Sequence, residues 1–486
     1  MSNLYLFAIG GSGSRVLRAM TMLLASGIEV NYNIIPMIID PDSKNGDLQR
    51  AVGEMRLYKS IHDQLTFNDQ TQSNFFSANI DSLNNDGLYL LPLDGIANIN
   101  YDAYIKLTEM SKENQAMMKM LFSNDNLSST MDVGFKGNPN IGSVVLNQFT
   151  QSQDYKTFEA NFVNGDKVFI ISSIFGGTGA SGFPLLLKSM RTSNNAALKD
   201  ANIGAVSLLP YFNLKDNNPK SKIKADSFVS KMKAALNYYE KNVTGNNTLD
   251  EMYYLGDQLS SQTYDNCDGG LMQENDAHII EMLAALSIID FDRRELQNNT
   301  KRRTKFHEFG LDKTPSGSIV FSDFGQTTKD LILKPLAQMA IMNSYLNNRA
   351  ISHMLSQRWA KDNNEILGDK FFNSTFFSSY STFKTGNPED KSGFERWLLQ
   401  MDNNQKSFAP FAKDSDLKSQ DGLNKVIGFP PHYSFSFFKK KGYDLIDVKL
   451  SDNFKGISKN LNAPSMFMEL FYVTTEELCS ENIDIN

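Results

Sequence analysis

The chain has 486 residues, of which 41% are hydrophobic and 21% are charged, proportions that are ordinary for a folded globular protein. This composition excludes a wholly disordered chain, a collagen and a coiled-coil rod. The formal net charge of −7 argues against broad contact with nucleic-acid phosphates, so no nucleic acid is expected as a partner.

Two cysteines, Cys267 and Cys479, are too few for a disulfide framework and favour a reducing compartment. The five histidines lie far apart in the sequence, so we expect no metal-binding cluster. No apolar run reaches the roughly 18 residues that a membrane span needs. The first residues also lack the pattern of a secretory signal. We therefore expect a cytoplasmic protein with no membrane span.

The first elements along the chain are a predicted strand, helix and second strand. Residues 4–9 form a continuous apolar run, which is typical of a strand buried on both faces. A glycine-rich loop follows at 10–14, and residues 15–26 have helical spacing. A second apolar run at 34–39 ends in Asp40. This order predicts an α/β fold with a doubly wound, mostly parallel sheet.

Later segments extend this pattern. Residues 43–128 are rich in Asn, Asp and Ser, which indicates an irregular, partly helical insertion. Further strands are expected at 167–174, 203–209 and 252–255, and helices at 227–241, 274–297 and 327–346. The helix at 274–297 is apolar over a wide arc and should be buried between two halves. Residues 300–315 should form a surface loop, and the aromatic-rich remainder a mixture of sheet and helix.

Two glycine-rich loops each follow a buried strand and precede a helix. Glycine lets the backbone approach a phosphate closely, and a helix N-terminus supplies free N–H groups and partial positive charge. In a doubly wound sheet both loops open onto the same edge. The pair therefore predicts a phosphate site, although one such loop alone is equally typical of a tight turn. The loop residues are Gly10, Gly11, Ser12, Gly13 and Ser14, and Gly176, Gly177, Thr178, Gly179, Ala180, Ser181 and Gly182.

The common phosphate and nucleophile motifs are absent. The sequence has no GxxxxGK[ST] loop and no GxSxG turn. Val16 stands where GxGxxG would have its last glycine, so a dinucleotide fingerprint is incomplete.

Six short segments, in order, resemble the tubulin/FtsZ superfamily. IFGGTGASGFP resembles the tubulin signature loop GGGTGSG, and AIGGSGSRVL resembles the first nucleotide loop of FtsZ, GVGGGGGNAV. IIDPDS is similar to INTDAQ, GFKGNPNIG to GAGANPEIG, VSLLPYFNL to VVTKPFNF, and QENDAHIIEMLAALS to AANDVLKGAVQGIAE. The matches share their order and spacing over about residues 4–290. By this resemblance the chain is identified as a divergent member of the superfamily.

The resemblance implies a guanine nucleotide, GTP or GDP, as the ligand and Mg²⁺ as a candidate second ligand. Besides the two loops, the matching positions are Asp40, Gly137 and Asn138, and Asn275 and Asp276. Gly137 and Asn138 resemble the loop that contacts the γ-phosphate. Asn275 and Asp276 resemble the residues that contact the base, where a carboxylate can accept from guanine N1 and N2; a helix N-terminal cap is the alternative reading. Two positions depart from the family pattern. Ser181 replaces a glycine of the signature loop, and Gly256 stands where the family has an asparagine that contacts guanine. The resemblance therefore implies phosphate binding more directly than it implies the identity of the base.

In this family, acidic residues after the central helix of one subunit orient water on the nucleotide of the next. Asp323 matches the first carboxylate of the family pattern NxDFADV, but Gln326 stands in place of the second, and the spacing from Asp276 is longer. Asp290 and Asp292 are the alternative catalytic pair, although we expect them to be solvated residues near a helix end. Weak hydrolysis, or none, therefore stays open.

The resemblance divides the chain into a nucleotide-binding domain at 1–273, with the insertion at about 43–128, a central helix at 274–298 and a C-terminal α+β domain at 299–486. It implies head-to-tail homopolymer filaments with GTP hydrolysis at the subunit interface. A protein adaptor could dock on the C-terminal domain or its acidic tail. Two alternatives stay open: a non-hydrolysing nucleotide-binding scaffold of the same fold, and a Rossmann-type NAD(P) enzyme that uses Gly10–Gly13 and Asp40.

Overall fold

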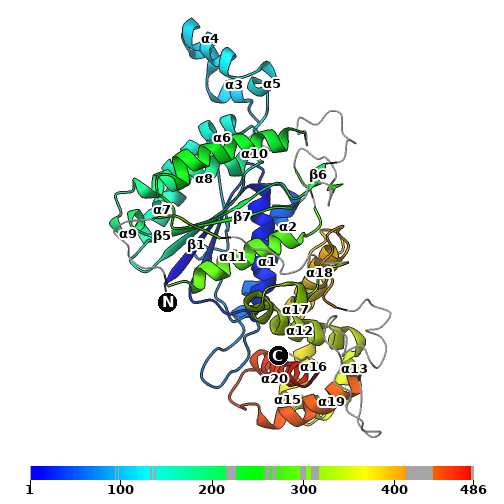
Figure 1. The fold of residues 1–486 in the computed structure, drawn as a ribbon. Coiled ribbons are helices and arrows are strands. Elements are labelled where there is room, and N and C mark those ends of the chain that lie inside the picture. Colours follow the sequence, from blue (N-terminus) through cyan, green and yellow to red (C-terminus); the bar gives the residue numbers. More distant parts are fainter. Residues whose placement is uncertain are drawn as a thin grey trace.

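A seven-stranded sheet forms the centre of the molecule, in the order β3-β2-β1-β4-β5-β7-β9 (Figure 1). The computed structural model describes residues 2–93, 95–96, 98–131, 134–135, 138–214, 226–257, 263–264, 270–273, 275–295, 303–307, 317–411 and 442–482. The strands of the sheet are β1 (Asn3–Ile9), β2 (Asn33–Ile39), β3 (Leu90–Leu91), β4 (Lys167–Ser173), β5 (Asn202–Leu208), β7 (Glu251–Leu255) and β9 (Lys305–His307). Every pair of neighbours is parallel, so the predicted doubly wound α/β sheet is confirmed. A separate parallel pair joins β6 (Asn213–Leu214) and β8 (Thr263–Tyr264).

Helices flank the sheet and continue beyond it. Those up to residue 293 are α1 (Gly10–Ala25), α2 (Gly46–His62), α3 (Tyr101–Tyr104), α4 (Lys112–Leu121), α5 (Asn124–Leu127), α6 (Pro139–Val145), α7 (Gln153–Asn161), α8 (Gly177–Arg191), α9 (Ala196–Lys199), α10 (Asp226–Tyr239) and α11 (Ile279–Arg293). The later helices are α12 (Gln326–Asn348), α13 (Ile351–Ser356), α14 (Arg358–Lys361), α15 (Asn364–Leu367), α16 (Asp369–Phe372), α17 (Thr375–Thr385), α18 (Phe394–Asp402), α19 (Gly442–Asn453) and α20 (Ala463–Asn482).

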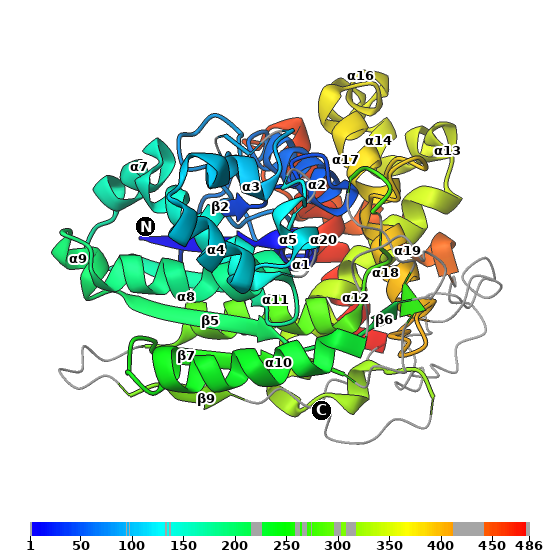
Figure 2. The same ribbon diagram turned by 90° about the horizontal axis from the view of Figure 1, so that it is seen from above.

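Alternate side chains of the strands enter two separate cores. Leu6 and Ala8 of β1 face α1, α2, α11 and the C-terminal helices, whereas Tyr5 and Phe7 face α6, α7 and α8. Because successive strand residues point to opposite faces, a strand covered on both sides is apolar throughout. This explains the continuous apolar runs in the sequence. Figures 1 and 2 show α8 and α10 on one side of the sheet and α1 and α11 on the other.

The described C-terminal residues form helices, not the expected mixture of sheet and helix. An isolated parallel bridge between Ile319 and Phe408 is the strand-like pairing found among them. Aromatic residues such as Phe371 and Phe467 pack ring against ring between helices, 4.9 Å apart. Most of the acidic chain end belongs to α20, in which Thr475 and Cys479 are fully buried. Within the described residues, no helix is both long and apolar enough to cross a membrane.

Two elements between the main strands bear on the sequence expectation. α2 lies in the segment predicted to be irregular and partly helical, and it is a regular helix that packs against α1 with Arg50 and Glu54 buried. β9 lies in the segment predicted to be a loop and pairs with β7. The irregular part of the insertion therefore begins after α2. It carries α3, α4 and α5, which project away from the body (Figure 1), and a bridge between Asn100 and Thr130 closes its base.

Gly13 should be required for folding. A Cβ at this position would lie 2.8 Å from the backbone carbon of Ala8 in β1. The strand cannot yield without disturbing the sheet, so Gly13→Ala should lower the free energy of unfolding by about 1–3 kcal/mol, despite the better helix propensity of alanine. Gly11→Ala is the matched control in the same helix, because its Cβ would meet nothing nearer than Asn45 Nδ2 at 3.9 Å. Urea unfolding compares the two variants, and equal midpoints would contradict this account.

Candidate functional site

The N-termini of two helices meet at one edge of the sheet. β1 and β4 are neighbours, and they lead into α1 and α8. A Cβ built on Gly10 would lie 3.4 Å from Thr178 Cβ and 3.8 Å from Gly179 N, so the two first turns are side by side. The predicted glycine loops are therefore largely the first turns of the helices themselves. They lie where the chain order reverses, the place at which ligands bind in open α/β sheets.

Neither of these helices is capped by a side chain. Their N-cap positions, Ile9 and Gly176, provide no side-chain acceptor, and neither first turn contains an acidic residue. In contrast, Asn45 caps α2 and Ser152 caps α7. The first N–H groups of a helix have no partner within the helix and carry partial positive charge. Two uncapped ends that converge favour an anionic ligand such as a phosphate.

The glycines at the starts of α1 and α8 are required for different physical reasons. Gly10 has a φ of +74°, a backbone conformation that favours glycine. Gly13 and Gly179 lie against strand backbone, since a Cβ on Gly179 would be 2.7 Å from Ser173 N. Gly182 packs against the Ile9 side chain, since a Cβ on Gly182 would lie 2.9 Å from Ile9 Cγ2. Close packing against β1 and β4 therefore explains why Gly13, Gly179 and Gly182 are glycines, without any ligand. Gly11, in contrast, has open space beside it.

Two other residues of the predicted loop at 176–182 make hydrogen bonds within the protein. The Ser181 hydroxyl donates to Gly177 O at 2.7 Å and lies 3.1 Å from Thr178 O, so it serves the helix. Ala180 O accepts a hydrogen bond from Tyr239 OH at 3.2 Å. The departure of Ser181 from the family glycine is thus accommodated by local helix hydrogen bonding.

A third predicted segment approaches α8. Asn138 is the N-cap position of α6, with Pro139 as the first helical residue. Gly142, about one turn later, faces α8: a Cβ on it would lie 2.9 Å from Gly177 O. Asn138 therefore lies near the second helix N-terminus. Gly137 lies outside the described residues.

Asp40 follows β2 at the same edge but is turned inward. It is 6% exposed, and its Oδ1 accepts the Asp42 N–H at 3.0 Å. Burial raises the pKa of Asp40 to about 7. A carboxyl enclosed in this way is poorly placed to bind a ribose hydroxyl, which disfavours the dinucleotide alternative.

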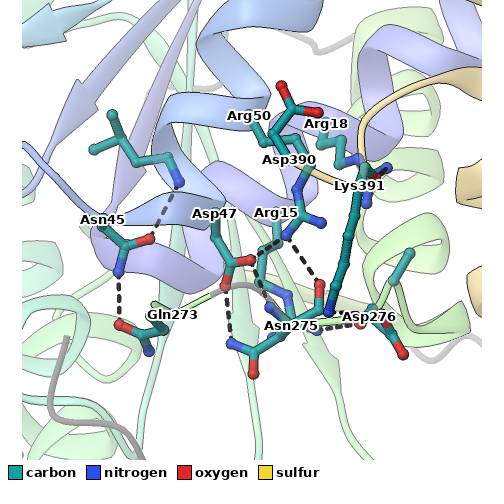
Figure 3. Close-up of polar contacts among 12 residues, drawn as sticks. Arg15, Arg18, Asn45, Asp47, Arg50, Gln273, Asn275, Asp276, Asp390 and Lys391 are labelled. Carbon is teal, nitrogen blue, oxygen red and sulfur yellow. Dashed lines mark hydrogen bonds and ion pairs between the residues drawn. The ribbon is translucent and has the colours of Figure 1, made fainter. Parts of the chain in front are cut away.

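Side chains from two helices hold the main chain of Asn275 and Asp276 (Figure 3). Asp47 accepts the Asn275 N–H at 2.9 Å and the Asn275 side-chain amide at 2.8 Å. Arg50 donates to Asn275 O at 3.0 Å, and Arg15 donates to Asp276 O at 2.9 Å. These bonds hold the stretch outside the helix, so α11 begins at Ile279 and not at residue 274 as predicted.

The same stretch is fixed to the C-terminal helices, just before α11. Gln400 Oε1 accepts the Ala277 N–H at 3.2 Å, and Asn404 donates to Ala277 O. His278 is the N-cap: its Nδ1 accepts the Ile280 N–H at 3.1 Å. The reading of Asn275 and Asp276 as the helix cap is therefore wrong. The Asp276 side chain stays 47% exposed at the site.

Three arginines are buried beside this stretch. Arg15 pairs with Glu281, Arg18 with Glu54 at 3.0 Å, and Arg50 with Asp47. Nevertheless, four buried polar atoms of this region have no hydrogen-bond partner in the described part of the chain: Ser14 Oγ, Arg15 Nε, and Nε and Nη1 of Arg50. Buried polar groups are normally satisfied, so unused donors here fit an anionic ligand.

Sequence reasoning missed Arg15, Asp47 and Arg50. A signal for Arg15 was present, because it stands in a helix whose other residues are mostly apolar and buried. Asp47 and Arg50 carry no comparable signal, since their partners lie more than 200 positions away.

The helix that follows the predicted catalytic carboxylate, Asp323, begins near the other end of α1. Thr327 and Asp330 of α12 line a cavity of about 490 Å³ together with residues 26–29, which follow α1. Asp323 ends the short helix η4 (Phe321–Asp323) just before α12, and its Oδ2 accepts the Val320 N–H at 2.9 Å. The sixteen residues of α1 span about 24 Å. Helix α1 thus separates this region from the glycine turns of the same chain.

The alternative pair is engaged within its own chain, and the expectation that both residues are solvated is wrong. Asp292 is 1% exposed, and its Oδ2 accepts the Asn31 N–H at 2.7 Å. Burial raises the pKa of Asp292. Asp290 Oδ2 accepts hydrogen bonds from Tyr253 OH at 2.5 Å and Arg294 Nε at 2.7 Å. These contacts hold α11 in place. Asp323 is therefore the better candidate for the catalytic carboxylate.

No family model and no curated protein matches the chain. Among solved structures it is similar to CetZ from Methanosaeta thermophila strain DSM 6194, with a TM-score of 0.28 and 15% identity over 61% of this chain and 57% of that chain. It is also similar to CetZ2 from Haloferax volcanii, a GTPγS-bound protofilament, with a TM-score of 0.26 and 11% identity over 52% and 49% of the two chains. An FtsZ mutant from M. jannaschii gives a TM-score of 0.27 and 15% identity over 52% and 46%.

These structures belong to the superfamily that the sequence motifs resemble. The matched part spans less than two thirds of each of those proteins.

Asp40 should make the protein less stable as the pH rises. Its pKa is 3.8 in an ordinary setting and about 7 in the folded chain, so between these values the folded state binds more protons than the unfolded state. The free energy of unfolding contributed by this group should therefore fall from about pH 4 to pH 7. Asp40→Asn keeps an oxygen for the Asp42 amide, and it should remove that slope and be the more stable protein above pH 7. Urea unfolding across this range measures the effect, with the exposed Asp452→Asn as control. Parallel curves for Asp40→Asn and the parent would contradict it.

Proposed function

We propose that the protein binds a guanine nucleotide where α1 and α8 meet. The observation that carries this proposal is the pair of uncapped helix N-termini on adjacent parallel strands. The first-turn N–H groups would hold the phosphates, and Asn138 would lie near the terminal one. Asn275 and Asp276 would face the base. Mg²⁺ would take its ligands mainly from phosphate oxygens and water, since no cluster of three metal-binding side chains occurs in the described ranges.

The proposed chemistry is GTP hydrolysis between two copies of the chain. The glycine turns and the first turn of α12, which follows Asp323 in the chain, are associated with opposite ends of α1. On this proposal a head-to-tail contact would bring the Asp323 of one copy to the nucleotide of the next. Such a contact joins two different surfaces and generates open filaments. Asp323 would orient and polarise the attacking water.

The second candidate function is a nucleotide-binding scaffold that does not hydrolyse. Gln326 favours it, because its Nε2 donates to Asp330 Oδ1 at 2.7 Å and an amide cannot act as a second carboxylate. Sedimentation with GTP, GDP, ATP and a slowly hydrolysed GTP analogue, with phosphate release measured in parallel, separates the two functions. Assembly without phosphate release would favour the scaffold, and no binding of any guanine nucleotide would remove both.

A negative charge at Gly11 should separate stability from nucleotide binding. The position has open space beside it, and an acidic side chain in the first turn of a helix favours the helix. Gly11→Glu should therefore fold at least as stably as the parent. The same charge would repel phosphates, so the affinity for GTP should fall by about tenfold or more.

Gly11→Gln is the matched control for Gly11→Glu, because it has nearly the same shape without the charge. Its affinity for GTP should lie between those of the parent and the glutamate variant. Titration with a fluorescent GTP analogue and thermal unfolding give the two readouts. Unchanged affinity in Gly11→Glu would place the phosphates elsewhere.

Asp323→Asn should bind GTP and assemble but slow hydrolysis by roughly two orders of magnitude, the usual scale for losing a general base. The asparagine oxygen can still accept the Val320 N–H, so the local fold is kept. Phosphate release by the parent should also rise steeply with protein concentration, because one copy alone lacks a complete site.

Mixing two variants tests whether the carboxylate acts on a neighbouring copy. Gly11→Glu keeps Asp323 but lacks a working nucleotide site, and Asp323→Asn has the opposite defect. A mixture should release phosphate faster than either variant alone if the site is shared between copies. Activity of Asp323→Asn equal to that of the parent would move catalysis away from this residue.

A further inference from the structure

A strap between α17 and α18 brings the C-terminal helices to the base end of the candidate site. Gly393 N, in this strap of residues 386–393, donates to Glu54 Oε1 of α2 at 2.8 Å. Arg18 of α1 and Gln400 of α18 both donate to Lys391 O at 3.2 Å. Three separate elements thus fix the main chain of the strap, two of them at Lys391 and one at Gly393.

Lys391 is held in a conformation that lysine rarely adopts. Its φ is +55°, and residues other than glycine keep such an angle only where the surroundings enforce it. The side chain extends toward the frame around Asn275 and Asp276 (Figure 3), and its Nζ lies 3.9 Å from Asp276 Oδ1. Both side chains are about half exposed, at 44% and 47%. An exposed ion pair of this kind adds little stability, so stability does not explain the strained backbone that supports it.

The pair presents a cation and a carboxylate next to each other at the same place. Asp276 is fixed through its carbonyl by Arg15 and by Tyr264 OH, both at 2.9 Å, and Lys391 is fixed by Arg18 and Gln400. A base that reached this edge would therefore meet one donor group and one acceptor group in a set order.

That order matches guanine. The guanine edge carries O6 as an acceptor, followed by N1–H and the N2 amino group as donors, so an ammonium beside a carboxylate complements it. Adenine carries an amino group and an unprotonated N1 at the corresponding places, and both would face a group of the wrong kind.

We propose that Lys391 is a specificity residue that donates a hydrogen bond to guanine O6, while Asp276 accepts from N1 and N2. The C-terminal helices then take part in choosing the base through the strap. This inference rests on the proposed guanine-nucleotide function. The role of Lys391 can fail without the proposed function failing, because phosphate binding at α1 and α8 does not require Lys391.

Lys391→Met tests the proposal with two nucleotide analogues. 6-Thio-GTP keeps N1–H and the N2 amino group but has a weak sulfur acceptor in place of O6, and ITP keeps O6 but lacks the N2 amino group. Lys391→Met should lower the affinity for GTP by about tenfold, the scale of one hydrogen bond to a charged group. The preference for GTP over 6-thio-GTP should shrink to about one, and the preference for GTP over ITP should stay. Lys391→Arg retains a donor and should keep most of the GTP preference.

The controls distinguish specificity from a structural role. Asp276→Asn should lower the preference for GTP over ITP, and Lys455→Met, which removes an exposed lysine paired with Asp452, should change neither ratio. An equal loss of GTP and 6-thio-GTP by Lys391→Met would make Lys391 a structural residue and overturn the proposal. An unchanged ratio with intact GTP binding would also overturn it, and would leave the proposed function standing. Failure of the parent to bind GTP would remove the proposed function itself.

Discussion

Residues 275–277 are held by side chains, and much of the molecule is positioned through them. Asp47 and Arg50 come from α2, Arg15 from α1 and Gln400 from α18. Each charged member has an opposite charge beside it, since a buried charge left without its partner costs about 3–5 kcal/mol. The start of α11, the docking of the C-terminal helices and the direction of Asp276 therefore depend on the same few side chains. Substitution of any of these side chains should therefore alter the start of α11, the docking of the C-terminal helices and the direction of Asp276 together.

The direction of the parallel sheet gives the molecule two chemically different ends. Helices that follow parallel strands run back along them, so their N-termini gather at one edge and their C-termini at the other. The positive ends of α1 and α8 lie at the first edge. At the second edge, Lys167 donates to Asp292 O at 3.0 Å and closes the C-terminus of α11. This polarity is the geometric basis of the head-to-tail contact proposed between identical copies.

The sequence was informative where burial alone determines structure. The apolar runs of β1, β4 and β5 identify strands covered on both faces, and the glycines after β1 and β4 indicate that a helix follows each strand. The first of these helices begins at Gly10 and not at residue 15 as predicted. The sequence was less informative where distant side chains decide. The start of α11 depends on Asp47 and Arg50, over 200 residues earlier in the chain. Arg50 and Glu54 also weaken the apolar pattern of α2, because they are charged in the sequence but buried in the fold. Each is buried beside a partner of opposite charge, which the local sequence does not reveal.

Short elements and aromatic segments were also beyond prediction, for different reasons. β9 has three residues, too few to show a period of two. The aromatic residues near Phe371 suit strands and buried helices alike, and here they fill the space between α16, α17 and α20. Predicting a fold in such regions needs knowledge of the neighbouring layer, which local sequence does not contain.

The glycine motifs combine two constraints that only coordinates can separate. Gly13, Gly179 and Gly182 allow a helix to lie directly on a strand, and they would be needed in the absence of any ligand. Gly11 is free of that constraint, and the missing caps of α1 and α8 are not explained by packing either. A match to a glycine-rich motif is therefore evidence mainly for a strand-to-helix geometry. The evidence for a ligand lies in what the geometry leaves over: two helix ends without a side-chain cap, and buried arginine donors without partners in the described chain.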